Sequence, residues 1–425
     1  MWSAFITALA LLFFVPKIDI NSAKTVIETS TEDGLLSYSE NEFDSADIGC
    51  KISLKEDITV KHPLLLVPGT GQFYTPVEQS SDLLFRKGES IELFCTHGFA
   101  DQTEDNSLTA YCDGANLFSL NGESYRISEL TCKRPPFHEV IRTEFNCFNG
   151  ASLLRVGFNV NTTFVPLYEI CFDEHSLRTH YVKHQLTPGN IYHQQTKRPP
   201  FIQGTFYPQL NMNKLYNFES QRNTLEQILG SQDRTDELLS KKGEMFFARG
   251  HLAAKADFVF SAQQRATFWF MNVAPQWQKF NGYNWQRIET GIKEFIARRN
   301  LTVTVYTGTY GTLELLDANG DPQSIYLDFD PNNGGRVPVS KVFYKIIHDE
   351  LNDAGIVLIG VNNPHASMEE IESNYIFCDD ISDQISWLKW KKDYIPGGFS
   401  YACDVNQFND KTKHLLLPKI GNLLV

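Results

Sequence analysis

Apolar and polar residues alternate on both sides of a short turn near residue 175. Tyr168, Ile170 and Phe172 occupy every second position before the turn, and Tyr181 and Val182 follow it. A period of two places such residues on one face of a strand. The pattern therefore predicts a β-hairpin over "VPLYEICFDEHSLRTHYVKHQL".

A helical period marks one long segment, residues 281–300. Its apolar residues recur at intervals of three and four: Trp285, Ile288, Ile292, Phe295 and Ile296. This spacing is typical of an amphipathic helix, and Arg298 and Arg299 suit its C-terminal end, where the helix dipole favours cations. We predict a helix here, with Asn281 at or just before its N-terminus.

Four other segments are apolar enough to be buried elements. We expect strands over residues 246–253, 266–276 and 301–311, the second of them ended by Pro275, and a helix over residues 340–353. This mixture of strands and helices predicts an α+β fold class.

Residues 50–132 contain short β-type runs separated by turn residues, among them "SIELFC", "LTAYCDG" and "YRISELTC". "KRPPF" at residues 133–137 is a stiff, extended segment that is typical of a boundary. We therefore expect a small β-rich, disulfide-bearing N-terminal module over residues 50–135 and a second domain over residues 136–425.

The N-terminus favours export. Residues 5–15 are apolar but too few to span a bilayer, which indicates a signal peptide over residues 1–23; the alternative is a buried helix or strand. An acidic, flexible lead-in is expected over residues 24–49. A secreted, extracellular protein would place its eight cysteines in disulfides: Cys50, Cys95, Cys112, Cys132, Cys147, Cys171, Cys378 and Cys403. Sequons at Asn161 and Asn300 are compatible with glycosylation.

The net charge of −13 argues against a generic nucleic-acid binder, because phosphates attract cations. The charge is unevenly distributed, however. Residues 241–300 carry ten Lys and Arg against four Asp and Glu, so this window is +6 and the remainder is −19. A basic footprint of this kind suits a polyanion. No later apolar run is long enough for a transmembrane helix, so no membrane partner is expected.

Candidate chemistry lies within this basic window. His251 follows Arg249 and Gly250, and a neutral imidazole accepts a proton near physiological pH. Asn281 and Glu289 offer the hard oxygen ligands that Mg²⁺ prefers, and they lie about two helical turns apart.

Taken together, "RGH" at 249–251, "NVAPQ" at 272–276, Asn281, Trp285 and Glu289 resemble the DNA/RNA non-specific endonuclease family with the ββα-metal fold. The form "GHLAAKADF" and the cysteine-bearing N-terminal region resemble most its secreted, insect branch, which degrades double-stranded RNA. The resemblance implies a ββα-metal fold around a mixed or antiparallel sheet and hydrolysis of DNA and RNA phosphodiester bonds, contacted through phosphates with little sequence preference.

The resemblance also implies roles for single residues. His251 corresponds to the general base, Asn281 to the direct ligand of Mg²⁺ (with Mn²⁺ as a substitute), and Glu289 to the carboxylate that holds a metal-bound water. Arg249 and Arg198 correspond to catalytic, phosphate-binding arginines. Further basic residues are expected to bind substrate: Lys255, Arg265, Lys279 and Arg287.

Two more features complete the sequence prediction. Members of the family commonly carry Asp where this chain has Ala248, which leaves a secreted nucleic-acid-binding protein with weak residual cleavage as the alternative function. Residues 88–132 loosely resemble a sushi-type module, and that resemblance implies pairing of Cys50 with Cys112 and of Cys95 with Cys132; the cysteine positions alone leave three pairings open.

Overall fold

The computed structural model describes residues 48–77, 80–100, 105–413, 415 and 417–425. The predicted signal peptide and nearly all of the acidic lead-in lie outside these residues; Ile48 and Gly49 open the first strand. The described chain has an α+β architecture, as predicted. No helix in this part of the chain combines the length and apolarity needed to cross a bilayer.

The largest element is a nine-stranded sheet in the order β21-β20-β19-β14-β11-β10-β9-β8, with β22 alongside β20. Its strands are β8 (Glu139–Asn146), β9 (Ser152–Val160), β10 (Thr163–Asp173), β11 (Arg178–Leu186), β14 (Val303–Tyr310), β19 (Val342–Asp349), β20 (Ala354–Val361), β21 (Ser400–Cys403) and β22 (Asn422–Leu423). All pairs are antiparallel except β20 with β22. The predicted hairpin is therefore confirmed as β10–β11, and its alternating residues Tyr168, Ile170 and Phe172 are buried.

The predicted helix over residues 340–353 is wrong, because this segment forms strand β19. All eight of its residues are buried, since the sheet is covered on both faces. Phe343 and Ile347 pack on the side of α6 (Gln286–Arg299), and Tyr344 and Ile346 pack on the side of α8 (Val405–Thr412). A strand that is buried on both faces has no polar alternation, so its sequence does not distinguish it from a buried helix.

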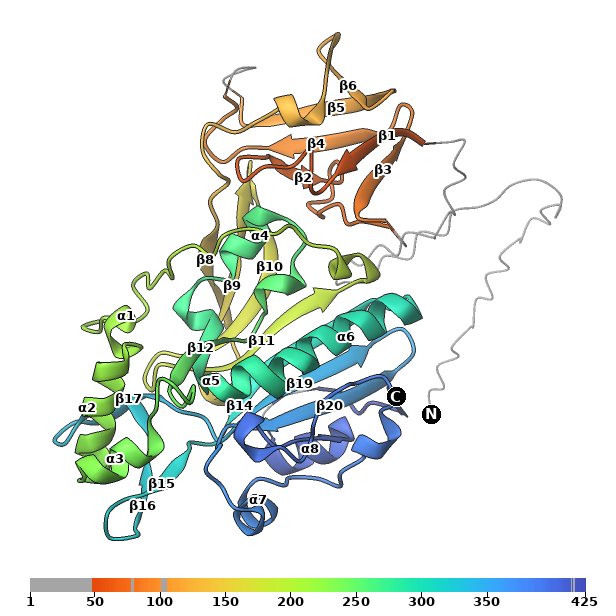
Figure 1. The fold of residues 1–425 in the computed structure, drawn as a ribbon. Coiled ribbons are helices and arrows are strands. Elements are labelled where there is room, and N and C mark those ends of the chain that lie inside the picture. The colour runs from red at the N-terminus through yellow and green to blue at the C-terminus, as the bar shows by residue number, and fades with distance from the viewer. Residues whose placement is uncertain (1–47, 78–79, 101–104, 414, 416) are drawn as a thin grey trace, which may run out of the picture. The chain divides into compact units, whose positions relative to one another are not determined.

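Helix α6 runs along one face of the sheet (Figure 1). Its residues Ile288, Ile292, Phe295 and Ile296 belong to the main core, as the helical period predicted. Asn300 ends the helix in the left-handed conformation that asparagine tolerates. The other sequon, at Asn161, lies exposed in the turn between β9 and β10.

The N-terminal β module (residues 48–132) contains two small sheets. One pairs β1 (Ile48–Ser53) with β3 (Asp82–Arg86), and the other has the order β2-β4-β5-β6-β7, formed by β2 (Leu64–Leu66), β4 (Ser90–Phe94), β5 (Ser107–Gly114), β6 (Leu117–Leu120) and β7 (Glu123–Tyr125). Disulfides join Cys50 to Cys112 and Cys95 to Cys132, which is the pairing that the sushi-type resemblance implies. The segment "YRISELTC" is mostly a turn rather than a strand, because a short 3₁₀ helix occupies residues 127–129.

The remaining cysteines pair within the second region, Cys147 with Cys171 and Cys378 with Cys403. The helices not yet given are α1 (Met212–Leu215), α2 (Phe218–Leu229), α3 (Gln232–Leu238), α4 (Ser261–Ala266), α5 (Gln278–Phe280) and α7 (Met368–Asn374). Three two-stranded sheets complete the fold: β12 (Phe247–His251) with β13 (Val273–Trp277), β15 (Glu314–Leu316) with β16 (Pro322–Ser324), and β17 (Tyr326–Asp330) with β18 (Gly334–Pro338).

The N-terminal β module shares its core with the region that follows it. Val259 and Phe260, which come from the loop after β12, are buried in the same hydrophobic cluster as the module's strands. Leu64, Leu66 and Phe94 of the module pack in turn with Phe158 and Val165 of the large sheet. These shared clusters indicate that the two regions fold against each other.

Candidate active site

The RGH triplet lies on β12, which pairs antiparallel with β13 immediately before the helical segment that contains α6. The predicted second strand over residues 266–276 is only partly correct. Strand β13 begins at Val273 and continues through Pro275 to Trp277, whereas residues 270–272 form a 3₁₀ turn. Phe268, Trp269 and Phe270 are core residues, as expected, and an apolar run alone does not separate a strand from a buried turn.

His251, at the end of β12, is held by two aromatic rings. The ring centroid of Phe201 lies 5.3 Å away and that of Phe268 lies 5.1 Å away. A hydrogen bond to the backbone of Arg249 uses part of its bonding capacity, while its Nε2 is buried with no partner in the structure. Burial, and then the charge of Arg198, lower the pKa of His251 to about 3. The imidazole is therefore neutral at neutral pH, with one nitrogen free to accept a proton.

Arg249 lies on the same side of β12 as His251 and is stacked among three aromatic rings. Its guanidinium lies 5.4 Å from the ring centroid of Phe201, 5.0 Å from that of Tyr216 and 5.6 Å from that of Phe270. Its Nη2 also donates to Asn213 Oδ1 at 3.2 Å. These contacts fix the side chain while leaving it half-buried, which suits an arginine that binds a phosphate.

Gly250 is required by the close approach of β13. A Cβ at this position would lie 2.3 Å from Oε1 and 2.7 Å from Cβ of Gln276. Ala248, which stands directly opposite Gln276 in the strand pair, offers no hydrogen-bonding group. Both amide atoms of Gln276 are buried without a partner in the described structure.

Asn281 lies one turn inside a helical segment rather than at its start, so the predicted N-terminus was too late. The helical segment begins with α5 at Gln278, and residues 281–285 form a π-helical stretch before α6. In a regular α-helix, eight residues leave Asn281 and Glu289 about 80° apart. One extra residue in a wide turn reduces the offset to about 20°, so the π-helical stretch brings the two onto nearly the same face.

The Asn281 and Glu289 side chains fit a hard divalent cation. Neither has a hydrogen bond or an ion pair with any residue that the structure describes, and both are only partly exposed. Burial raises the pKa of Glu289 to about 7, against the opposing effect of Lys345. An amide oxygen and a carboxylate that lack other partners are the kind of ligands that Mg²⁺ takes, since it keeps most of its waters.

Arg198 acts electrostatically on both ends of this site. Its charge lowers the pKa of His251 and that of Glu289, and it also lowers the pKa of Lys255. The Arg198 side chain is exposed and is held by no described residue. Lys255, after β12, instead donates to the backbone oxygen of Thr196 at 2.8 Å. The structure thus places Arg198 within electrostatic range of His251 and Glu289 together.

The structure does not join the other basic residues expected at the substrate to His251. Lys279 pairs with Glu244 at 3.4 Å. Arg287 donates to the backbone of Tyr283 at 3.0 Å and stacks on its ring, 3.8 Å from the centroid. The charge of Arg265 lowers the pKa of His138, and Nε of Arg265 is buried without a partner among the described groups. No contact of the described chain brings these three to His251.

Sequence reasoning missed a buried group of charges beneath Glu289. Asp257 accepts from His184 Nε2 at 3.1 Å and lies 4.0 Å from Lys293 Nζ. Lys345, which is 1% exposed, donates to Thr307 Oγ1 at 2.7 Å and to the oxygen of Leu252 at 3.2 Å. The positive charge of Lys345 lowers the pKa of both Asp257 and Glu289. These residues come from four distant segments, so no local motif could have joined them.

Comparisons with known proteins identify the family to which the chain belongs. The DNA/RNA non-specific endonuclease family model matches residues 149–408, more than half of the chain. A salivary endonuclease of Lutzomyia longipalpis is 27% identical over 88% of this chain and 86% of its own length. The salivary protein Tsal1 of Glossina morsitans morsitans is 25% identical over 75% of this chain and 78% of its own.

Among solved structures, a chain of the EndoG/EndoGI complex overlaps 48% of this chain and 74% of its own, with 19% identity and a TM-score of 0.29. The family match spans β12, β13, α6 and most of the large sheet. The chain belongs to the DNA/RNA non-specific endonuclease family and is a nuclease.

Proposed function

We propose that this protein is a secreted, Mg²⁺-dependent endonuclease that hydrolyses DNA and RNA, double-stranded RNA included, with His251 as its general base. The observation that carries the proposal is the buried, unpartnered Nε2 of His251. Arg198 acts electrostatically on this residue, and Asn281 and Glu289 lie on the helix that follows. Nucleases of this family are metal-dependent, and the donor set here suits a hard cation.

Hydrolysis requires a nucleophile made from water. In the proposed step, Nε2 of His251 accepts a proton as the water oxygen bonds to phosphorus and the bond from phosphorus to the 3′-oxygen breaks. The leaving 3′-oxygen takes up a proton from solvent water, so the products carry a 5′-phosphate and a 3′-hydroxyl. Arg249, fixed by its three rings, and Arg198 would bind the phosphate oxygens as their charge increases.

Asn281 and Glu289 would hold the metal, Asn281 directly and Glu289 through water. When bound, Mg²⁺ supplies the positive charge that stabilises the leaving oxygen. Neutral His251 and a cationic arginine on either side of a phosphate make an arrangement that requires no base contacts, which supports low sequence preference.

Secretion is supported by two observations. All eight cysteines are disulfide-bonded, which is typical of oxidising compartments. Two similar proteins have "salivary" in their names. The signal peptide over residues 1–23 and glycosylation at Asn161 and Asn300 belong to the same proposal.

The test is cleavage of plasmid DNA and double-stranded RNA by the purified protein, with Mg²⁺ and with a chelator. We expect His251→Ala to lower kcat by about 10²- to 10⁴-fold while binding is retained, because only the proton acceptor is removed. His175→Ala is the matched control, since His175 is exposed in the hairpin turn and should leave cleavage unchanged.

Unchanged cleavage by His251→Ala would show that the base lies elsewhere. If the wild type and His251→Ala were equally inert but both bound tightly, a nucleic-acid-binding role would replace hydrolysis. Ala248, in place of the acidic residue common in the family, is the feature that makes this second outcome worth measuring.

A further inference from the structure

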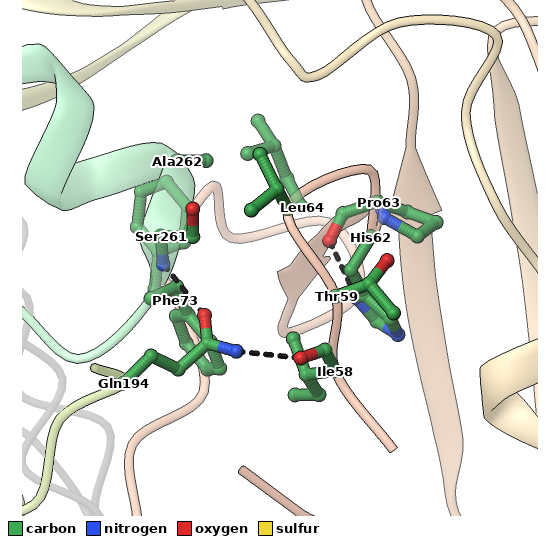
Figure 2. A pocket seen from close by; sticks show the side chains of 11 residues that line it. Ile58, Thr59, His62, Pro63, Leu64, Phe73, Gln194, Ser261 and Ala262 are labelled. Atoms are coloured by element: carbon green, nitrogen blue, oxygen red, sulfur yellow. Dashed lines mark hydrogen bonds between the residues drawn. The ribbon is translucent and has the colours of Figure 1, made fainter. Parts of the chain in front are cut away.

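We call residues 136–425 the nuclease region. The side-chain amide of Gln194 joins the N-terminal β module to this region. Its Nε2 donates to the backbone oxygens of Leu54 at 3.2 Å and Ile58 at 2.8 Å, both in the module. Its Oε1 accepts from the backbone N–H of Ser261, the first residue of α4, at 2.7 Å. Figure 2 shows the amide reaching from one region to the other, toward Ile58 and Ser261. Gln194 is buried, so each of these bonds is shielded from water.

The cavity beside Gln194 is too small to be a ligand site. It measures about 10 Å³ and is lined by residues of both regions, among them His62, Phe73 and Phe260. A space of this size holds about one water molecule. The seam between the two regions is therefore packed, and the amide of Gln194 is one of the polar links across it.

The backbone around Gln194 is anchored at four further points. The Gln194 N–H donates to Val259 at 2.9 Å, and its oxygen accepts from Gln264 Nε2 at 2.9 Å. Thr196 donates through Oγ1 to Gln264 at 2.7 Å and accepts at its backbone oxygen from Lys255 at 2.8 Å. The segment 194–196 is thus held by α4 and by the loop that follows His251.

Arg198 lies two residues beyond this anchor. The chain is fixed again at Ile202, whose N–H donates to the oxygen of Phe268 at 2.8 Å and whose own oxygen accepts from Phe270 at 3.0 Å. Pro199 and Pro200 stiffen the intervening span, because each ring locks φ. Since Arg198 itself has no partner among the described residues, its place near His251 depends on the backbone at either end of this short span.

We propose that Gln194 is a positioning residue for the nuclease reaction, through which the N-terminal β module sets the place of Arg198 at the scissile phosphate. This inference rests on the proposed phosphate-binding role of Arg198. The module is then part of the catalytic apparatus rather than an attached domain with a separate task.

The experiment is a double-mutant cycle in the full-length chain. Gln194→Ala, Arg198→Ala and the double variant are compared for KM and kcat on plasmid DNA and double-stranded RNA at several salt concentrations. We expect Gln194→Ala to raise KM and lower kcat/KM about 5- to 10-fold, and to reduce the salt dependence of KM, because a phosphate contact is misplaced. In the Arg198→Ala background the same change should have little further effect, since the two residues act as a unit.

Asn406→Ala is the matched control for the loss of a side-chain amide link. The Asn406 amide donates to Ile420 at 2.8 Å and accepts from it at 3.0 Å in the C-terminal region, so this variant should lower Tm and leave KM unchanged. Gln194→Met, which keeps the length of the side chain, repeats the test if Gln194→Ala fails to fold, and we expect the same rise in KM and the same dependence on Arg198.

Two results would overturn the inference while the nuclease assignment stands. One is a loss of kcat/KM that is equally large with and without Arg198. The other is wild-type KM in folded Gln194→Ala or folded Gln194→Met. If Arg198→Ala alone cleaved like the wild type, the proposed role of Arg198 would fail and the inference would fail with it.

Discussion

At the scale of single residues, Ala248, which stands where the family commonly has Asp, lies opposite a buried polar side chain. Gln276 stands opposite Ala248, and residues opposite each other in an antiparallel pair share a face. The Gln276 amide is buried with neither atom bonded in the described structure, which is costly for a polar group. Arg249 and His251 point to the other face of β12, because side chains alternate along a strand.

We therefore expect Ala248→Asp to change the stability of the fold more than it changes the cleavage reaction. A carboxylate at this position would accept a hydrogen bond from the Gln276 amide, and we expect the free energy of unfolding to rise by about 1 kcal/mol. Urea denaturation at neutral pH measures this change. Adding Gln276→Leu should abolish the gain, whereas a gain that survives in the double variant would refute this explanation.

The residues proposed for the site could be picked out of the sequence only where they are local in it. Arg249, His251, Asn281 and Glu289 fall within 41 residues and are recognised by their mutual spacing. Gln194 and Lys345 were not predictable in this way. Their interactions join segments that are far apart in the sequence, such as Gln194 with Ile58 and Lys345 with Leu252.

At the scale of elements, periodicity succeeded where one face of an element is exposed and failed where both are covered. Helix α6 and the hairpin β10–β11 kept their polar faces and were predicted. Strand β19 has none and was taken for a helix. The π-helical stretch at residues 281–285 was also beyond prediction, because it inserts one residue into a turn without a proline or a glycine run to mark it.

The loop after β12 supplies the next prediction, because Asp257 offsets the charge of buried lysines there. The interactions with His184, Lys345 and Lys293 hold the pKa of Asp257 well below its usual range, although burial opposes them. A carboxyl whose pKa falls on folding adds stability above its unfolded pKa of about 4, and this stability is lost as the pH falls below that value. We expect Asp257→Asn to cost about 3–5 kcal/mol at pH 7, since it leaves buried positive charge without a counterion.

Urea denaturation of Asp257→Asn at a series of pH values measures this effect. The difference from the wild type should shrink as the pH falls from 5 toward 3, because the wild-type carboxyl then becomes protonated in the unfolded chain. Asp236→Asn is the matched control: Asp236 pairs with Arg222 at 2.7 Å but is exposed, so its loss should cost under about 1 kcal/mol. A difference that does not change with pH would contradict the role assigned to Asp257.

At the scale of the whole molecule, the basic footprint of residues 241–300 includes lysines that pair with acidic residues of the chain itself. Lys293 lies 4.0 Å from the buried Asp257, and Lys279 pairs with the exposed Glu244. Of the two arginines proposed to bind phosphate, Arg249 lies in this window and Arg198 lies outside it. The net charge of +6 for this window therefore includes charge that is already paired within the chain.

The shared core predicts that the N-terminal β module and the nuclease region unfold together. Phe260 belongs to the nuclease region by sequence, yet it is 6% exposed within the hydrophobic cluster of the module. We expect one calorimetric transition for the wild type and a lower Tm for Phe260→Ala, which should lose about 3–5 kcal/mol of stability because a large buried ring is removed. Phe145→Ala, at a residue that is 68% exposed, should leave Tm unchanged. Two separate transitions, with only one of them shifted by Phe260→Ala, would show that the regions fold independently and that the module does not stabilise the loop behind His251.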